Sequence, residues 1–210
     1  MFGIINFEAF LIAGIILNLT PGADTMYILG RSISQGKKAG ILSALGISTG
    51  ELVHCIFAAL GLSIILAKSA IAFMAVKYLG AAYLIYLGIK TLFSKTKEDF
   101  KVDTSQESTN YKKVFLSGIF TNILNPKVAL FFLVFLPQFI DPNFAQSPIP
   151  FLILGLVFLA TGTVWCLILA LFASKMSTRI RENYKFKIWL DKITGGIFVL
   201  LGIKLALSER

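Results

Sequence analysis

Long apolar runs separated by polar connections are the feature that most constrains how this chain can fold. A helix that crosses a bilayer needs about 20 consecutive, mostly apolar residues. The 210-residue sequence contains six runs of about that length, at positions 4–19, 41–67, 70–93, 114–140, 149–173 and 193–207. Unpaired backbone groups are costly in lipid, which excludes an open sheet, and a barrel would show alternating short segments. The sequence therefore predicts an all-α integral membrane protein with six transmembrane helices.

The composition supports this prediction and argues against several other classes of protein. Hydrophobic residues make up 56% of the chain and charged residues only 15%, whereas soluble domains usually carry more charge. This balance argues against a soluble enzyme, a disordered chain and a disulfide-stapled secreted module. The net charge of +9 lies mainly in the connections and shows no aromatic-interleaved basic motif, so nucleic acid is not an expected partner.

The placement of Lys and Arg predicts the orientation of the chain in the membrane. Basic residues gather in the first, third and fifth connections: Arg31, Lys37, Lys38, Lys95, Lys97, Lys101, Lys112, Lys113, Lys175, Arg179, Arg181, Lys185, Lys187 and Lys192. The other side carries only Lys68, Lys77 and Arg210. Cytoplasmic loops are enriched in Lys and Arg, so both termini are expected outside the cytoplasm. The basic segment 175–192 could also bind anionic lipid, but we favour the explanation that its charges set the orientation of the chain in the membrane.

The two halves of the sequence resemble each other. YLGAAYLIYLGIKTLFS (78–94) aligns with KITGGIFVLLGIKLALS (192–208), sharing LGIK in register. GIILN (14–18) resembles GIFTN (118–122), which ends on Asn122, and a proline follows each within four residues. Thr-Gly at 49–50 likewise matches Thr-Gly at 161–162. Three matches in the same order indicate an internal repeat.

The repeat predicts the domain organisation. The first three-helix repeat covers residues 1–93 and the second covers residues 114–210. The polar segment 94–113 between them is rich in Ser, Thr and charges, and is expected to be a cytoplasmic linker. Because three spans are an odd number, the second repeat enters the membrane from the opposite side. Inverted repeats are typical of secondary transporters, whose binding sites lie near the bilayer midplane at the repeat interface.

Two prolines predict helix breaks within the membrane. A straight helix over 4–30 would be about 40 Å long, longer than a hydrocarbon core of about 30 Å. We therefore expect helices 1 and 4 to be broken at Pro21 and Pro126. The half-helix N-termini beyond these breaks suit a substrate carboxylate, and the carbonyls released near Leu17 and Asn18 suit an ammonium group. An amino acid carries both groups.

Charged side chains stand beside both breaks. Asp24 lies three residues after Pro21, and Lys127 directly follows Pro126. Charged residues within a membrane span are costly and mark functional sites by default. We expect Asp24 and Lys127 to face each other across the repeat axis and to bind substrate. Asp24 could also cap the second half-helix, which is compatible with binding.

The second span carries the candidates for proton coupling. Ser48, Glu51 and His54 recur every three residues and are expected to share one helix face. Burial penalises a charged carboxylate, so Glu51 can gain and lose a proton, as Asp24 also can. The residue that matches Glu51 in the second repeat is Thr163, so only one half carries this carboxylate. His54 is either a proton relay or a hydrogen-bonded packing residue.

The two cysteines raise a different possibility. Cys55 and Cys166 lie near equivalent repeat positions, which leaves open a thiol oxidoreductase or a metal site. Neither belongs to a C-x-x-C motif, and soft-metal sites need several ligands, so both are interpreted as small buried hydrophobes. No Walker loop, HExxH helix or nucleophile motif is present in the sequence. We therefore expect no enzyme activity, no cofactor and no metal site.

Two motif blocks resemble the LysE/RhtB family of bacterial amino-acid exporters. They are NLTPGADTMYILGRSISQGKKAGILSALGISTG (18–50) and NPKVALFFLVFLPQF (125–139), in family order and spacing. Ala23 departs from the family, in which a second proline is common. The resemblance carries the family motifs onto these positions: Asn18, Thr20, Pro21, Gly22, Asp24, Asn125, Pro126 and Lys127. With Asn122 from the repeat, they form the expected substrate-binding set.

The resemblance implies an inner-membrane carrier that exports an amino acid such as homoserine, threonine, lysine or leucine, driven by the proton-motive force. The expected function is therefore amino-acid export by proton antiport with alternating access. The expected partners are the amino acid, protons and the lipid bilayer, and a homo-oligomer is left open. The alternatives are a cation or heavy-metal exporter, and a membrane thiol oxidoreductase that uses Cys55 and Cys166.

Overall fold

The computed structural model describes residues 2–62 and 110–173, with isolated positions between 74 and 93 and between 192 and 207. Most of the predicted third and sixth spans, most of the linker 94–113 and most of the basic segment 175–192 lie outside the described residues. The described part is all-helical: it contains no strand, and one isolated bridge joins Ile4 to Ile140.

The first helical segment of the chain is interrupted at residues 20–22. Helix α1 (Phe7–Leu19) ends before Thr20, and helix α2 (Ala23–Phe57) begins after an extended Gly22 with φ −158°. Proline has no backbone N–H and its ring clashes with the preceding turn, so Pro21 does not continue α1. The N–H groups at the start of α2 and the last carbonyls of α1 are thereby left for other partners.

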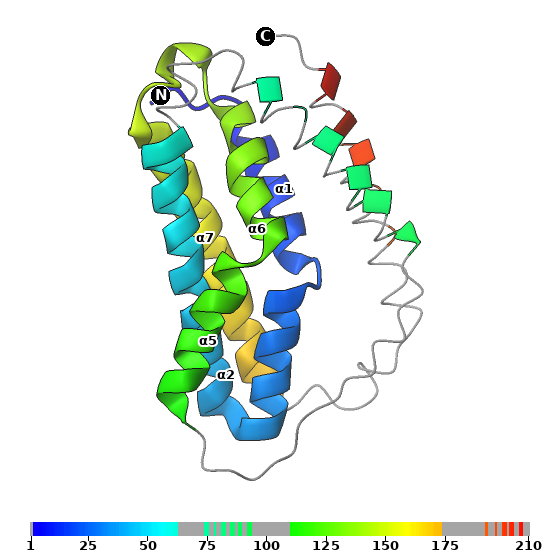
Figure 1. Ribbon diagram of the computed structural model, residues 1–210, viewed down its shortest axis with the longest axis vertical. Helices are drawn as coiled ribbons and strands as arrows, with labels where there is room; N and C mark the ends of the chain where they lie inside the picture. Colours follow the sequence, from blue (N-terminus) through cyan, green and yellow to red (C-terminus); the bar gives the residue numbers. More distant parts are fainter. Residues whose placement is uncertain are drawn as a thin grey trace.

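Helix α2 contains a chain reversal at Gly36. Its backbone there has φ 83° and ψ 177°, a conformation that favours glycine. A Cβ built on Gly40 would lie 3.3 Å from the Cα of Ser32, a closeness that a continuous helix does not allow between residues eight apart. The helix therefore runs as two antiparallel parts, 23–35 and 37–57, with Lys37 directly after the turn (Figure 1). A short π-helix, η1 (Ala58–Leu62), continues the second part.

The chain from residue 110 onward has its own interruption. Helix α5 (Tyr111–Ile123) is capped by Asn110, whose side chain accepts a hydrogen bond from the backbone N–H of Lys113 at 3.0 Å. Helix α6 (Pro126–Leu130) begins after Asn125 and continues through η2 (Phe131–Phe135) and η3 (Leu136–Phe139). The two segments are bent by 46° at the break. After η4 (Pro142–Phe144), helix α7 (Pro148–Phe172) crosses the bundle in one piece.

The helices form one bundle in which the two interruptions lie close together. In Figure 1, α1 and the first part of α2 run downward, whereas α5 and α6 run upward. The second part of α2 packs closely against α5, because Gly46 meets Gly118: a Cβ on Gly46 would lie 3.2 Å from the Cα of Gly118. Small residues at four-residue spacing, here Gly46 and Gly50, allow such close helix contact in membranes.

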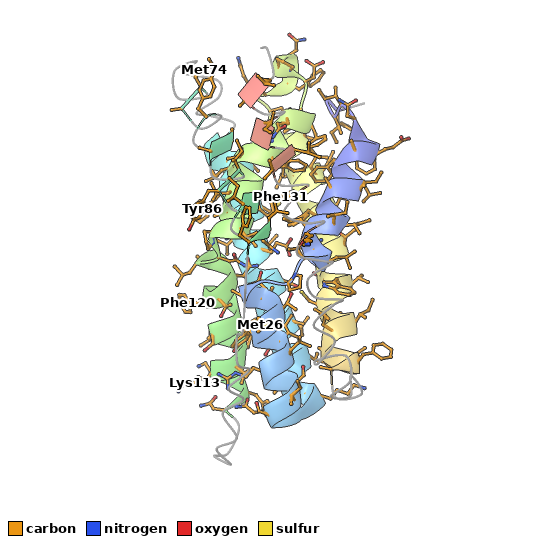
Figure 2. All side chains as sticks on the ribbon, turned by 90° about the vertical axis from the view of Figure 1, so that its right-hand side faces the viewer. Met26, Met74, Tyr86, Lys113, Phe120 and Phe131 are labelled. Carbon is orange, nitrogen blue, oxygen red and sulfur yellow. The ribbon has the colours of Figure 1, made fainter. Side chains whose placement is uncertain are left out.

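The surface and the interior have the polarity expected of a membrane protein. In the described part of the chain, two helical segments are long and apolar enough to cross a bilayer: Pro148–Phe172 and Ala23–Gly61, the second of which reverses at Gly36. The bent pair Tyr111–Ile123 with Pro126–Phe139 is a third if it forms one span. Large apolar side chains are exposed on the outside, such as Phe120, which projects from α5 away from the bundle (Figure 2). Glu51 and Asn122, in contrast, are buried.

The buried apolar residues form two separate clusters. The larger one is rich in phenylalanine and includes Phe10, Phe131 and Phe158, with the rings of Phe131 and Phe158 stacked at 3.9 Å between centroids. The smaller one is built around Ile28 and Leu169. Apolar side chains from both clusters lie beside the polar residues of the two interruptions.

Candidate functional site

A small cavity lies where the two helix interruptions meet α7. Its volume is about 30 Å³, which is room for one or two water molecules. All of the helices named α contribute to its walls. The lining residues are Asn18, Gly22, Asp24, Thr25, Ile47, Glu51, Asn122, Lys127, Val128, Phe158, Gly162, Trp165 and Cys166.

Asp24 joins the start of α2 to the break between α5 and α6. Its Oδ2 accepts hydrogen bonds from Nδ2 of Asn122 and from Nδ2 of Asn125, both at 3.0 Å. Oδ1 of Asn125 also accepts a hydrogen bond from the backbone N–H of Lys127 at 3.0 Å and so caps α6. The carboxylate stands at the positive end of the α2 dipole, where a negative charge is stabilised.

Lys127 makes the reciprocal connection. Its Nζ donates hydrogen bonds to the carbonyls of Leu17 and Thr20, both at 3.1 Å. The sequence had suggested that carbonyls near Leu17 and Asn18 would bind a substrate ammonium group. In the structure the chain's own ammonium group binds the carbonyls of Leu17 and Thr20. The carbonyl of Leu17 also accepts the backbone N–H of Thr20 at 3.2 Å, and it has no donor four residues later because that residue is Pro21. Asp24 and Lys127 line the same cavity but form no ion pair among the described residues.

Glu51 occupies a space that a glycine keeps open. A Cβ on Gly162 of α7 would lie 3.1 and 3.3 Å from the carboxylate oxygens of Glu51, and 3.3 Å from Oδ1 of Asn18. Glu51 is 4% exposed. The side chain of Asn18 is itself fixed, because its Nδ2 donates to Oγ1 of Thr161 at 3.2 Å. The carboxylate of Glu51 therefore lies among α1, α2 and α7.

Four buried polar atoms around the cavity have no hydrogen-bond partner among the described residues. They are Oδ1 of Asp24, Oε1 of Glu51, Oδ1 of Asn122 and Nε1 of Trp165. A buried polar atom without a partner is unfavourable by about 1–3 kcal/mol. Because all four belong to residues of one cavity, they indicate a site that receives water or a polar solute.

The residues of the second span do not all face this cavity. Ser48 accepts a hydrogen bond from the hydroxyl of Thr163 in α7 at 2.8 Å. His54 turns instead to α5, where its Nε2 lies 3.1 Å from the carbonyl oxygen of Asn122, and its ring stacks on Phe132. Three residues advance a helix by less than one turn of 3.6 residues, so the three positions fan out across about 120°. Only Glu51, in the middle, reaches the cavity.

The structure brings together most of the predicted substrate-binding residues. Those that line the cavity are Asn18, Gly22, Asp24, Asn122 and Lys127, while Asn125 contacts Asp24 from outside the lining. Thr20 is buried behind Lys127, whereas Pro21 and Pro126 are exposed and shape the backbone without lining the cavity.

Several cavity residues were missed by the sequence analysis. They are Thr25, Ile47, Val128, Phe158, Gly162, Trp165 and Cys166. The repeat match at 161–162 was a signal for Gly162, but it was interpreted as architecture. No pattern in the sequence distinguished Phe158 or Trp165 from the other aromatic residues of an apolar span.

The cysteines occupy different surroundings. Cys55 belongs to the larger apolar cluster and lies against Gly155 of α7, whereas Cys166 packs against the smaller cluster and lines the cavity. Both thiols are free. Among the described residues no group of three or more His, Cys, Asp or Glu side chains could hold a metal ion.

A helical membrane bundle with a buried polar cavity at paired helix breaks defines a membrane transport protein. The model of the LysE type translocator family matches residues 15–209. The chain belongs to this family. The family match covers both interruptions and all the residues that line the cavity.

Individual relatives span nearly the whole chain. The chain is 39% identical to the uncharacterized membrane protein YrhP of Bacillus subtilis, over 90% of this chain and 93% of that protein. It is 30% identical to a leucine efflux protein of Klebsiella pneumoniae, over 98% of this chain and 96% of that protein. It is 28% identical to the uncharacterized membrane protein PA4757 of Pseudomonas aeruginosa, over 97% of this chain. No solved structure matches the chain.

Proposed function

We propose that this chain exports an amino acid, or a derivative of one, across the bacterial inner membrane by proton antiport with alternating access. One observation carries the proposal: the cavity at the two helix interruptions is walled by Asp24, Glu51 and Asn122, each with an acceptor atom that has no partner among the described residues. Family membership and the similarity to a leucine efflux protein support the assignment to export.

The architecture proposed for this function is two inverted three-helix repeats, residues 1–93 and 114–210, joined by a cytoplasmic linker at 94–113. The first and fourth membrane helices would be broken at Pro21 and Pro126. The opposite directions of α1 and α5 in Figure 1, each followed by an interruption, support this arrangement. The turn at Gly36, with Lys37 and Lys38 beside it, would face the cytoplasm and place the termini outside.

The cavity suggests how the two charged groups of an amino acid would be bound. The unpartnered acceptors of Asp24, Glu51 and Asn122 suit the ammonium group. The backbone N–H groups at the start of α2 and Nε1 of Trp165 suit the carboxylate. The cavity has room for only one or two water molecules, so the helices must separate to admit a larger amino acid. Alternating access provides that separation.

Glu51 is proposed as the group that couples substrate release to proton uptake. It is buried, it lies in the cavity, and its Oε1 has no partner in the described part of the chain. A carboxylate in such a position can alternate between a charged form that holds an ammonium group and a neutral form that releases it. Asp24 is the second candidate for this role. His54 contacts Asn122 and could pass a proton to the site from α2.

Efflux from proteoliposomes tests the proposal. Vesicles with the purified protein are loaded with one labelled amino acid at a time, and efflux is measured with and without an acidic exterior. We expect the acidic exterior to accelerate efflux of at least one amino acid, and Glu51→Gln to abolish that acceleration. Glu8→Gln changes an exposed carboxylate of α1 and is the matched control.

Two results would contradict this proposal. If no amino acid leaves the vesicles faster than from protein-free vesicles, the chain is not an amino-acid exporter. If the folded Glu51→Gln variant keeps the full response to acid, Glu51 is not the coupling group, and the same measurement on Asp24→Asn and His54→Gln assigns the role.

A further inference from the structure

The ammonium group of Lys127 binds at the carboxyl end of helix α1. Its two acceptors, the carbonyls of Leu17 and Thr20, are each 3.1 Å from Nζ. Carbonyls at the end of a helix carry the negative pole of its dipole. Leu17 and Thr20 are only 6% and 4% exposed, so the ammonium group binds them away from the surface.

The backbone next to these carbonyls is in contact with the end of the lysine side chain. A Cβ on Gly22 would lie 3.5 Å from Nζ and 3.8 Å from Cε of Lys127, so the end of the lysine side chain lies directly against this glycine. The other end of the residue is also fixed, because the backbone N–H of Lys127 donates to Oδ1 of Asn125. The lysine thus spans from the start of α6 to the end of α1.

Carbonyls released where a membrane helix unwinds are suited to bind a monovalent cation. We propose that the carbonyls of Leu17 and Thr20 form such a cation site, and that the ammonium group of Lys127 fills it permanently. The chain thereby supplies covalently the positive charge that a bound Na⁺ would otherwise provide at this interruption. No Na⁺ is needed at the break, and the acceptors of Asp24 and Glu51 stay available to a solute.

The proposed site is independent of which solute the chain carries, and it can be tested without a transport assay. Lys127→Ala removes three methylene groups and the ammonium group, which together correspond to n-propylammonium. A ligand that binds only the folded protein raises its unfolding temperature. The measurement is therefore the thermal unfolding midpoint of purified protein in detergent, at equal ionic strength, with n-propylammonium, Na⁺ or the larger cation choline as the chloride salt.

We expect Lys127→Ala to unfold at a lower temperature than the wild type in choline chloride. n-Propylammonium should raise the midpoint of this variant by at least about 3 °C over choline, whereas n-propanol, which has the same stem without the charge, should not. The wild type and the control Lys112→Ala, which alters an exposed lysine of α5, should have equal midpoints in Na⁺ and in choline.

Two outcomes would overturn the proposal. One is a folded Lys127→Ala variant whose midpoint is the same with n-propylammonium, n-propanol and choline. The other is a wild-type midpoint that rises with Na⁺ relative to choline, which would show that the lysine does not satisfy the need for a cation. If Lys127→Ala does not fold, Lys127→Met retains most of the stem, and Na⁺ should then raise its midpoint over choline. The comparison of the wild-type midpoints in Na⁺ and in choline tests the proposal even if neither variant folds.

Discussion

The carboxylate of Asp24 accepts a hydrogen bond from the side-chain amide of Asn122 at 3.0 Å, and this bond joins the start of α2 to the end of α5. Lys127 makes the complementary connection, from the start of α6 to the end of α1. Each interruption therefore satisfies polar groups of the other. A change in the packing of one interruption must alter the hydrogen bonds of the second, which is a means of coupling the two halves of the bundle.

Asn122→Ala should weaken this connection. Asn122 is 1% exposed, and its loss leaves the half-buried Asp24 with one amide donor instead of two. Hydrogen bonds to charged groups contribute about 1.5–3 kcal/mol, so we expect the free energy of unfolding to fall by about 2 kcal/mol. The measurement is thermal or chemical unfolding of the purified protein in detergent.

Thr121→Val is the matched control for Asn122→Ala. Among the described residues, the hydroxyl of Thr121 bonds to the carbonyl of Ser117 in its own helix and to no other group, so its removal should have a much smaller effect. Equal losses for the two variants would show that the bond to Asp24 contributes nothing to stability.

Gly162→Ala should impair transport while the protein stays folded. The added methyl group would lie 3.1 Å from one carboxylate oxygen of Glu51 and 3.3 Å from Oδ1 of Asn18, closer than ordinary contacts. We expect the carboxylate to shift and the rate of efflux to fall by about tenfold, because small displacements at a functional site have large effects on rate. Gly30→Ala in α2 has nothing within 4 Å of the new Cβ and should transport normally. Unchanged efflux in Gly162→Ala would show that the position of Glu51 is not critical.

Trp165→Phe tests which group of the solute meets the indole N–H. The variant keeps the aromatic ring but removes Nε1–H, which has no partner in the described structure. If this donor binds a carboxylate, the KM for the exported amino acid should rise about fivefold with little change in kcat, since a single hydrogen bond of about 1 kcal/mol is lost. The corresponding decarboxylated amine serves as the comparison in the same efflux assay. A similar loss for the amine would exclude the proposed contact.

Gly118→Ala should destabilise the contact between α2 and α5. A Cβ at this position would lie 2.9 Å from the carbonyl oxygen of Ser43 and 3.2 Å from the Cα of Gly46, and these are backbone atoms that cannot rotate away. Overpacking of this kind destabilises proteins by about 1–3 kcal/mol. The unfolding midpoint in detergent is the measurement, with Gly61→Ala, which adds a Cβ in open space, as the control. A midpoint equal to that of the control would mean that the two helices separate at little cost.

The parts of the site that could be predicted are those with a local signature. Pro21 and Pro126 mark places where a helix cannot continue, and the described helices end at Leu19 and Ile123 and resume at Ala23 and Pro126. Charged residues within apolar spans also stand out in the sequence, because each is unfavourable in lipid. Asp24, Glu51 and Lys127 could therefore be selected as candidates before any contact was known.

The partners of these residues could not be predicted in the same way. Asp24 and Lys127 line one cavity, but Asp24 bonds to Asn122 and Asn125, while Lys127 bonds to main-chain carbonyls. A carbonyl group is present in every residue, so no side-chain pattern indicates which one will accept a bond. The role of Gly162 depends on the empty space beside Glu51, and empty space has no signature in a sequence.

The sequence by itself determined that this is an all-helical membrane protein of a translocator family, because the length of an apolar run and the order of motifs are properties of the chain alone. The tertiary structure decided which groups meet at the cavity. Asp24 and Asn122 are 98 positions apart, and Lys127 and Leu17 are 110 apart. Contacts over such separations depend on how the helices pack, and packing follows from the shapes of all the facing side chains together.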